Sequence, residues 1–221
     1  YIDWMPFFNA WEFHGKYPAI LSDDTVGEAA TALYKDARAM LEQILREEWL
    51  QARAVLGLFA ANSADHDDVL LYADEARTTS IERLCNLRQQ RAKPEGQPQN
   101  CLADFVAPEN SGVSDFLGAF AVTAGIGIDE RVAHFEKAHD DYNAILLKAL
   151  ADRLAEALPE HRHARERKQP CGYAPDERLG NEAQIAERHR GIRPAPGYPP
   201  FPDHTEKGKL WSLLDVEKNI D

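Results

Sequence analysis

The sequence has few cysteines, and the three that it has lie far apart. Cys85, Cys101 and Cys171 are not joined by a CxxC or CxxxH spacing. Their odd number and wide separation argue against both a disulfide framework and a zinc site. We therefore expect reduced thiols, as in a cytoplasmic protein.

The chain also lacks an apolar run long enough to cross a membrane, and it has no signal segment in which basic residues precede apolar ones. Basic residues are in deficit, because 25 Lys and Arg stand against 37 Asp and Glu, which gives a net charge of −12. Such a surface repels phosphate backbones and excludes a sequence-independent grip on nucleic acid. We expect a soluble, cytoplasmic protein with neither nucleic acid nor a membrane as partner.

Motifs of the common enzyme classes are missing as well. The sequence contains no P-loop, GxSxG elbow, HExxH pair or Rossmann fingerprint, and residues 125–128 (GIGI) match only half of a dinucleotide motif. His161 and His163 lie in a basic stretch that we interpret as a solvated helix surface. Residues 139–141 (HDD) are expected inside a helix, where consecutive side chains diverge. The sequence thus predicts no metal site and no catalytic residue.

The remaining sequence alternates between helical periodicity and short apolar runs. Its 221 residues suffice for one domain with a sizeable core. Helices and strands interleave without regular βαβ units, which favours an α+β fold with a mostly antiparallel sheet. The patterns predict helices over 25–48, 76–91, 130–165, 180–190 and 205–217, and strands over 53–60, 69–72, 101–106 and 115–123.

The segment RPAPGYPP, residues 193–200, is unlike the rest. Four prolines in seven residues fix φ repeatedly, so we expect an extended, stiff backbone whose remaining N–H groups are free of secondary structure. Ala195, Gly197 and Tyr198 keep their N–H groups, and Arg193 can pair with a carboxylate. This chemistry suits an amino-acid-bearing nucleotide. The residues alone nevertheless favour a proline-rich surface loop or a ligand of an SH3-like domain.

Longer stretches resemble a known family. GIRPAPGYPPFPDHTEK, residues 191–207, closely resembles the signature of the activation domain of cobalamin-dependent methionine synthase. Further segments match that family in the same order along the chain, so the resemblance covers essentially all of it. These are YIDWMPFF (1–8), GLFAAN (57–62), LRQQ (87–90), CLADFVAP (101–108), GAFAVTAG (118–125), HDDYNAILLKALADRLAEA (139–157), GYAPDE (172–177) and LWSLLDVEKN (210–219).

The resemblance implies a fold and a ligand. It implies one C-shaped domain over 1–221, with a bent antiparallel sheet and flanking helices, that binds S-adenosylmethionine in a shallow groove. Asp3 is then expected to accept from the amino group of the ligand, and Arg193 to hold its carboxylate. The backbone of Ala195, Gly197 and Tyr198 is expected at the adenosine, with Glu156 near the ligand. The family's domain begins before Tyr1 and continues past Asp221 with an aromatic pair, so we expect the chain to be incomplete at both ends.

The resemblance also implies a role. Within a methyltransferase of methionine biosynthesis, such a domain supports reductive methylation of cob(II)alamin to methylcobalamin and has no autonomous catalysis. Cobalamin is held by a neighbouring domain of the same polypeptide, and flavodoxin or a diflavin reductase supplies the electron. Two alternatives stay open: a non-enzymatic docking module for a cobalamin domain and a flavoprotein, and an S-adenosylmethionine sensor.

Overall fold

The structure, a computed structural model of the chain, describes residues 1–169 and 171–220. The chain divides into two compact units, and each is described by itself. The first unit comprises Tyr1–Arg53 and Val122–Arg188, and the second comprises Ala54–Ala121 and His189–Asp221.

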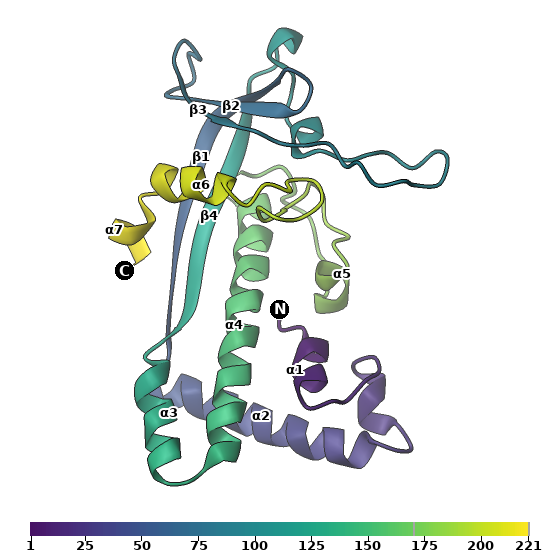
Figure 1. Cartoon of the computed structure of the whole chain (residues 1–221), viewed down its shortest axis with the longest axis vertical. Helices are drawn as coiled ribbons and strands as arrows, with labels where there is room; N and C mark the ends of the chain where they lie inside the picture. The colour runs from purple at the N-terminus through teal and green to yellow at the C-terminus, as the bar shows by residue number, and fades with distance from the viewer. Residues whose placement is uncertain (170, 221) are drawn as a thin grey trace. The chain divides into compact units, whose positions relative to one another are not determined.

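The first unit is built from helices. They are α1 (Trp4–Ala10), the 3₁₀ turn Ala19–Ser22, α2 (Gly27–Glu47), α3 (Ile128–Lys137), α4 (Asp141–Lys168) and α5 (Asn181–Ile185). Figure 1 shows α3 and α4 side by side, joined by a tight turn, and α2 crossing near the start of α4. Their shared core contains Trp4, Phe7, Phe8, Ile20, Ala30, Leu33, Ala37, Met40, Ile44, Trp49, Val132, Ala144, Leu146, Leu147 and Leu150.

The helix predicted over 25–48 is confirmed as α2. The carboxylate of Asp23 accepts hydrogen bonds from the N–H groups of Thr25 (2.8 Å) and Val26 (3.0 Å), just before the helix begins. The helix ends at Glu47, and the capping residue Glu48 adopts a left-handed conformation with φ of 52°. The apolar residues at three- and four-residue steps face the core.

The single helix predicted over 130–165 is wrong, because the chain breaks it into α3 and α4. His139 takes a φ of 57°, and the Asp140 side chain caps α4 by accepting from the N–H of Asn143 at 3.1 Å. Residues 139–141 therefore form an interhelical turn and not the middle of a helix. Pro159 lies inside α4, which nevertheless continues to Lys168.

The second unit contains a sheet in the order β3-β2-β1-β4. Its strands are β1 (Gln51–Ala64), β2 (Asp68–Tyr72), β3 (Ser80–Leu84) and β4 (Asp115–Ile126), of which β1 and β4 begin or end in the first unit. Ala61 pairs with Leu71 in the antiparallel β1–β2 hairpin, and Val69 pairs with Leu84 between antiparallel β2 and β3. The predicted α+β class with a mostly antiparallel sheet is confirmed.

Two element predictions in this unit are wrong. Residues 76–91 were expected to be helical but contain β3, because Leu84 is buried by pairing with β2. Residues 101–106 were expected to be a strand but form a 3₁₀ turn, Leu102–Phe105. Cys101 caps this turn, and Asp104 accepts a hydrogen bond from the N–H of Cys101 at 3.0 Å.

The C-terminal helices α6 (Glu206–Leu213) and α7 (Val216–Ile220) pack on the sheet of the second unit (Figure 1). Gly57 in β1 makes room for this packing, since a Cβ there would lie 2.6 Å from the ring of Phe59 and 2.9 Å from Cδ2 of Leu214. The core of this unit contains Ala61, Val69, Leu71, Leu84, Cys101, Ala103, Val106, Leu117, Ala119, Leu214, Val216 and Ile220.

Within the described ranges, the helices are all too short or too polar to span a lipid bilayer.

Candidate functional site

The later part of the RPAPGYPP segment of the second unit, with Phe201, folds into a compact turn over residues 195–201, where its prolines predict extended backbone. Gly197 has a φ of 107°, a conformation that favours glycine. Its N–H donates to the carbonyl of Phe201 at 2.8 Å, and the Phe201 N–H donates back to Tyr198 at 2.8 Å. The N–H of Tyr198 donates to the carbonyl of Ala195 at 3.1 Å. Two of the three N–H groups expected to be available for a ligand are therefore used inside the turn.

The turn leaves its largest side chain in solvent. Tyr198 is 62% exposed although its backbone is fixed on both sides. Arg193, five residues earlier, is half-buried, and Ala195 and Gly197 are exposed. The Leu102 N–H donates to the carbonyl of Pro200 at 2.9 Å, which anchors the turn. Tyr198, one of the four predicted residues of this segment, thus presents an exposed aromatic face.

The same segment continues into α6 through Asp203 and Thr205. The Asp203 carboxylate accepts from the Thr205 hydroxyl at 2.7 Å and from the Thr205 N–H at 2.8 Å. These bonds lower the pKa of Asp203. Its carboxylate is ionised at neutral pH and closes the chain into the first turn of the helix.

Asp3, in the first unit, caps α1. Its Oδ1 accepts from the N–H of Met5 at 3.0 Å, and the side chain is half-buried. The cap fixes the position of the carboxylate, whose second oxygen has capacity for another donor. This geometry fits the acceptor role that the resemblance implies for Asp3.

Glu156 also belongs to the first unit and lies on an exposed part of α4. The N-terminal segment runs to the same helix, because the rings of Tyr1 and His161 meet edge to face at 5.2 Å. α1 itself packs against α4. The structure therefore places Asp3 and Glu156 in one unit, and Arg193, Ala195, Gly197 and Tyr198 in the other. The meeting of the two groups around one ligand stays a prediction.

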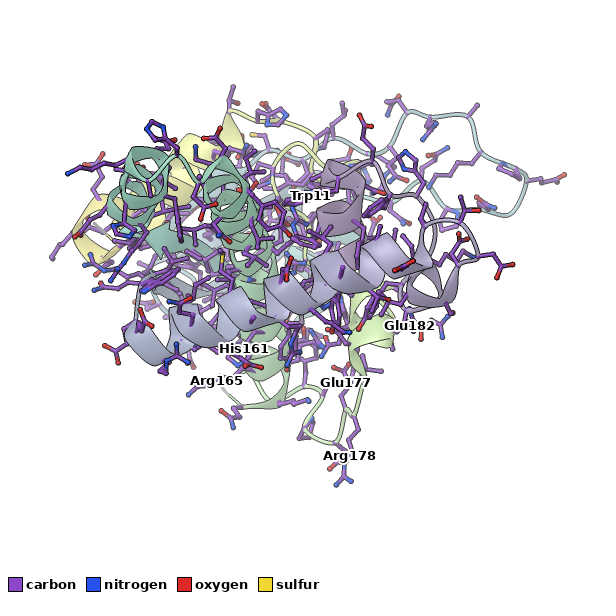
Figure 2. All side chains as sticks on the ribbon, turned by 90° about the horizontal axis from the view of Figure 1, so that it is seen from below. Trp11, His161, Arg165, Glu177, Arg178 and Glu182 are labelled. Carbon is purple, nitrogen blue, oxygen red and sulfur yellow. The ribbon has the colours of Figure 1, made fainter. Side chains whose placement is uncertain are left out.

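The end of α4 holds a buried polar network that the sequence did not predict. Arg167 is fully buried and donates from Nε to the Glu177 carboxylate at 2.9 Å. Its Nη1 lies 2.8 Å from Nδ1 of His163, and its Nη2 donates to Gln184 at 3.1 Å. Figure 2 labels His161 and Arg165 on this part of α4, and Glu177 and Glu182 on the segment that follows it. The basic stretch that contains His161 and His163 was interpreted as a solvated surface, but one side of it is buried in the first unit.

An apolar hollow of about 560 Å³ lies in the first unit beside α4. Its described lining does not include Glu156 or Asp3, so we do not assign the ligand to it. The residues that line it include Tyr1, Leu45, Leu50, Leu154, Leu158 and His161.

In the portions of the chain that the structure describes, no three His, Cys, Asp or Glu side chains come together in a way that could hold a metal ion. Gly125 and Gly127, with φ of 100° and 94°, form the turn from β4 into α3. A Cβ at Gly127 would lie 3.0 Å from the carbonyl of Trp49, which gives this glycine a packing role.

Comparison with known proteins assigns the chain to a family. The family described as "Vitamin B12 dependent methionine synthase, activation domain" matches residues 1–221. A solved structure described as "Crystal Structure of the MetH Reactivation Domain bound to AdoHcy" is 54% identical to this chain, with a TM-score of 0.91 over 99% of it. The chain spans 66% of the length of that structure's chain. This protein belongs to the family of activation domains of vitamin B12-dependent methionine synthase.

Proposed function

We propose that this chain binds S-adenosylmethionine and presents its methyl group for the reductive reactivation of cobalamin. The observation that supports this most is the RPAPGYPP segment, whose turn exposes the Tyr198 ring five residues after the half-buried Arg193. The related MetH reactivation domain was solved with AdoHcy bound, which is the demethylated form of S-adenosylmethionine. A product-shaped ligand in a relative of 54% identity supports the same ligand class here.

The chemical groups of the predicted residues match those of the ligand. The carboxylate of Asp3 suits the ligand's ammonium group, and the guanidinium of Arg193 suits its carboxylate. The flat face of Tyr198 suits the adenine by stacking. The N–H groups of Gly197 and Tyr198 already donate within the turn. We therefore assign these two residues to close contact with the ligand and to accepting its hydrogen bonds through their carbonyl oxygens. Glu156 supplies a further acceptor from α4.

Cobalamin, held by a neighbouring domain of the same polypeptide, supplies the methyl acceptor. When cobalamin is present, the overall reaction would consume one electron and move the methyl group from sulfur to cobalt, so that cob(II)alamin and S-adenosylmethionine would give methylcobalamin and S-adenosylhomocysteine. We assign the electron to flavodoxin or a diflavin reductase. This chain contributes no general base or nucleophile, and its residues bind and orient the methyl donor.

Calorimetric titration of S-adenosylmethionine tests the binding site. We expect Arg193→Ala to weaken binding by at least about tenfold, because a charge-assisted pair contributes about 1.5–3 kcal/mol. Arg188→Ala, a change of an exposed arginine five residues earlier, is the matched control and should bind like the wild type. Equal binding by Arg193→Ala and the wild type would overturn the assignment of Arg193.

The same titration separates the two alternatives. A docking module should bind a cobalamin domain and a flavoprotein without measurable affinity for S-adenosylmethionine. A sensor should bind S-adenosylmethionine tightly without any affinity for a cobalamin domain. The proposed function requires both interactions.

A further inference from the structure

His204 and Gly197 meet across the RPAPGYPP turn. A Cβ built on Gly197 would lie 2.3 Å from Cε1 of His204, 2.7 Å from Nε2 and 3.0 Å from Nδ1. Real side chains do not approach so closely, so the imidazole occupies the space that a residue-197 side chain would take. The ring therefore lies directly against the backbone of the turn, and only glycine at 197 permits this.

The position of His204 is set by the start of α6. Asp203, the preceding residue, is locked by its two hydrogen bonds from Thr205, and the N–H of Lys207 donates to the His204 carbonyl at 3.2 Å. The backbone of His204 is thus fixed at the entry to the helix, and its imidazole starts from this fixed point beside the turn.

The helix is in turn fixed to the sheet. Glu206 is 3% exposed, and its carboxylate accepts from the N–H of Cys85 at 3.2 Å and from Lys209 at 2.9 Å. Lys209 also donates to the carbonyl of Arg83, at the end of β3, at 2.6 Å. A continuous set of contacts therefore runs from β3 through α6 to His204 and on to Gly197.

His204 does not belong to the core of the second unit. The residue is exposed, unlike Glu206 two positions later. A side chain that packs on backbone while remaining in solvent contributes little to the core of the unit. Its effect is local to the turn that displays Tyr198 and Arg193.

We propose that His204 is the positioning residue of the ligand-binding turn. Its imidazole holds Gly197 at a φ of 107° and so fixes the direction in which the Tyr198 ring faces. This inference rests on the proposed function, in which the turn binds S-adenosylmethionine. It extends that function by naming a residue outside the predicted six that prepares the site before the ligand arrives.

The test is a set of four variants titrated with S-adenosylmethionine in the calorimeter. His204→Ala should weaken binding about tenfold, and His204→Phe, which keeps a flat ring, should restore it to within about threefold of the wild type. Gly197→Ala should weaken binding at least about tenfold. The double variant Gly197→Ala/His204→Ala should bind more tightly than Gly197→Ala alone, because the added methyl no longer meets the ring and only the backbone strain at φ 107° remains. Lys207→Ala, a change at an exposed position of α6, is the control and should leave binding unchanged.

Two results would overturn the proposal. One is wild-type affinity in His204→Ala, and the other is a double variant that binds no better than Gly197→Ala. Circular dichroism and thermal unfolding of each variant identify any loss of affinity that comes from unfolding. The proposal is then judged on the variants that remain folded.

Failure of the proposed function gives a different pattern. If the wild type itself does not bind S-adenosylmethionine, the ligand assignment fails, and the positioning role is judged by nuclear magnetic resonance alone. His204→Ala should then shift the amide signals of Gly197 and Tyr198, and His204→Phe should shift them less. Unchanged amide signals in His204→Ala would contradict the role of His204 in holding the turn.

Discussion

The guanidinium of Arg167 lies wholly inside the first unit and bonds the carboxylate of Glu177 through both Nε and Nη2. The pair joins the end of α4 to the segment before α5, ten residues further along the chain. Glu177 is only 12% exposed, and this cation stabilises its charge.

Arg167→Ala is therefore expected to destabilise the chain by about 3–5 kcal/mol, since it leaves a buried carboxylate without that cation. Urea unfolding measures this difference. Arg165→Ala, on the exposed side of the same helix, is the matched control and should change stability by no more than about 0.5 kcal/mol. Similar stabilities of the two variants would contradict the structural importance of the pair.

Gly57 and Gly118 provide a matched pair of changes in the sheet. A methyl group at Gly57 would meet Phe59 and Leu214 at less than 3 Å, whereas one at Gly118 meets no atom within 4 Å. Overpacking of this kind costs about 1–3 kcal/mol. We expect Gly57→Ala to lower the unfolding midpoint in urea and Gly118→Ala to leave it nearly unchanged. A Gly57→Ala variant that is as stable as Gly118→Ala would be evidence against the close packing of Phe59 and Leu214 at Gly57.

The ion pair between Arg88 and Asp104 predicts a pH dependence of stability. Hydrogen bonds from Arg88 at 2.6 and 2.7 Å lower the pKa of Asp104 below its ordinary value. A carboxyl group with a lowered pKa stabilises the folded state above its unfolded pKa, about 3.9, and this stabilisation is lost as the pH falls through the folded value.

Arg88→Gln should therefore lower the melting temperature at pH 7, and the difference from the wild type should shrink as the pH approaches 3. Both side chains are partly exposed, so the effect should be modest and should decrease with added salt. If the difference in melting temperature between the variant and the wild type grew as the pH fell, the predicted direction of the pH dependence would be wrong.

The three cysteines should differ in reactivity. Burial raises the pKa of the Cys101 thiol, and burial together with Glu166 raises that of Cys171. Cys85 is exposed, and its sulfur lies 3.8 Å from the ammonium of Lys209. With a thiol-disulfide reagent we expect one fast thiol in the folded protein, and Cys85→Ser should abolish that phase. A fast phase that survives in Cys85→Ser would contradict the assignment of Cys85 as the most reactive of the three thiols.

Local patterns predicted several elements correctly. The apolar residues of α2 recur at helical spacing over 21 residues, and β1, β2 and β4 are apolar runs separated by turn residues. Each of these signals lies within the element itself. That is why α2 and the β1–β2 hairpin could be predicted from sequence.

Other elements depend on contacts that are distant in sequence. Ile81, Leu84 and Leu87 have helical spacing, and only pairing with β2 selects a strand for this segment. No Gly or Pro marks the break between α3 and α4 at His139. The one local signal was Asp140, whose side chain caps α4 by accepting from the N–H of Asn143. The burial of Arg167 follows from Glu177 and Gln184, which approach α4 only in the folded unit.

The candidate site shows the same division. Arg193 and Tyr198 stand out because prolines surround them, and family resemblance added Asp3 and Glu156. The resemblance did not indicate that the N–H groups of the turn are used internally, because that depends on Phe201 folding back on Gly197. His204 was missed because its contact with Gly197 concerns shape and involves no recognisable motif.

The reactivation role is tested most directly by methyl transfer to cobalamin. The chain, a cobalamin-binding methionine synthase domain holding cob(II)alamin, a one-electron donor and methyl-labelled S-adenosylmethionine are combined, and label on cobalamin is measured. We predict one labelled methyl group per cobalamin with the wild type and with Arg188→Ala, and at least about tenfold slower transfer with Arg193→Ala. No transfer by the wild type, or equal rates with and without Arg193, would contradict the proposed function.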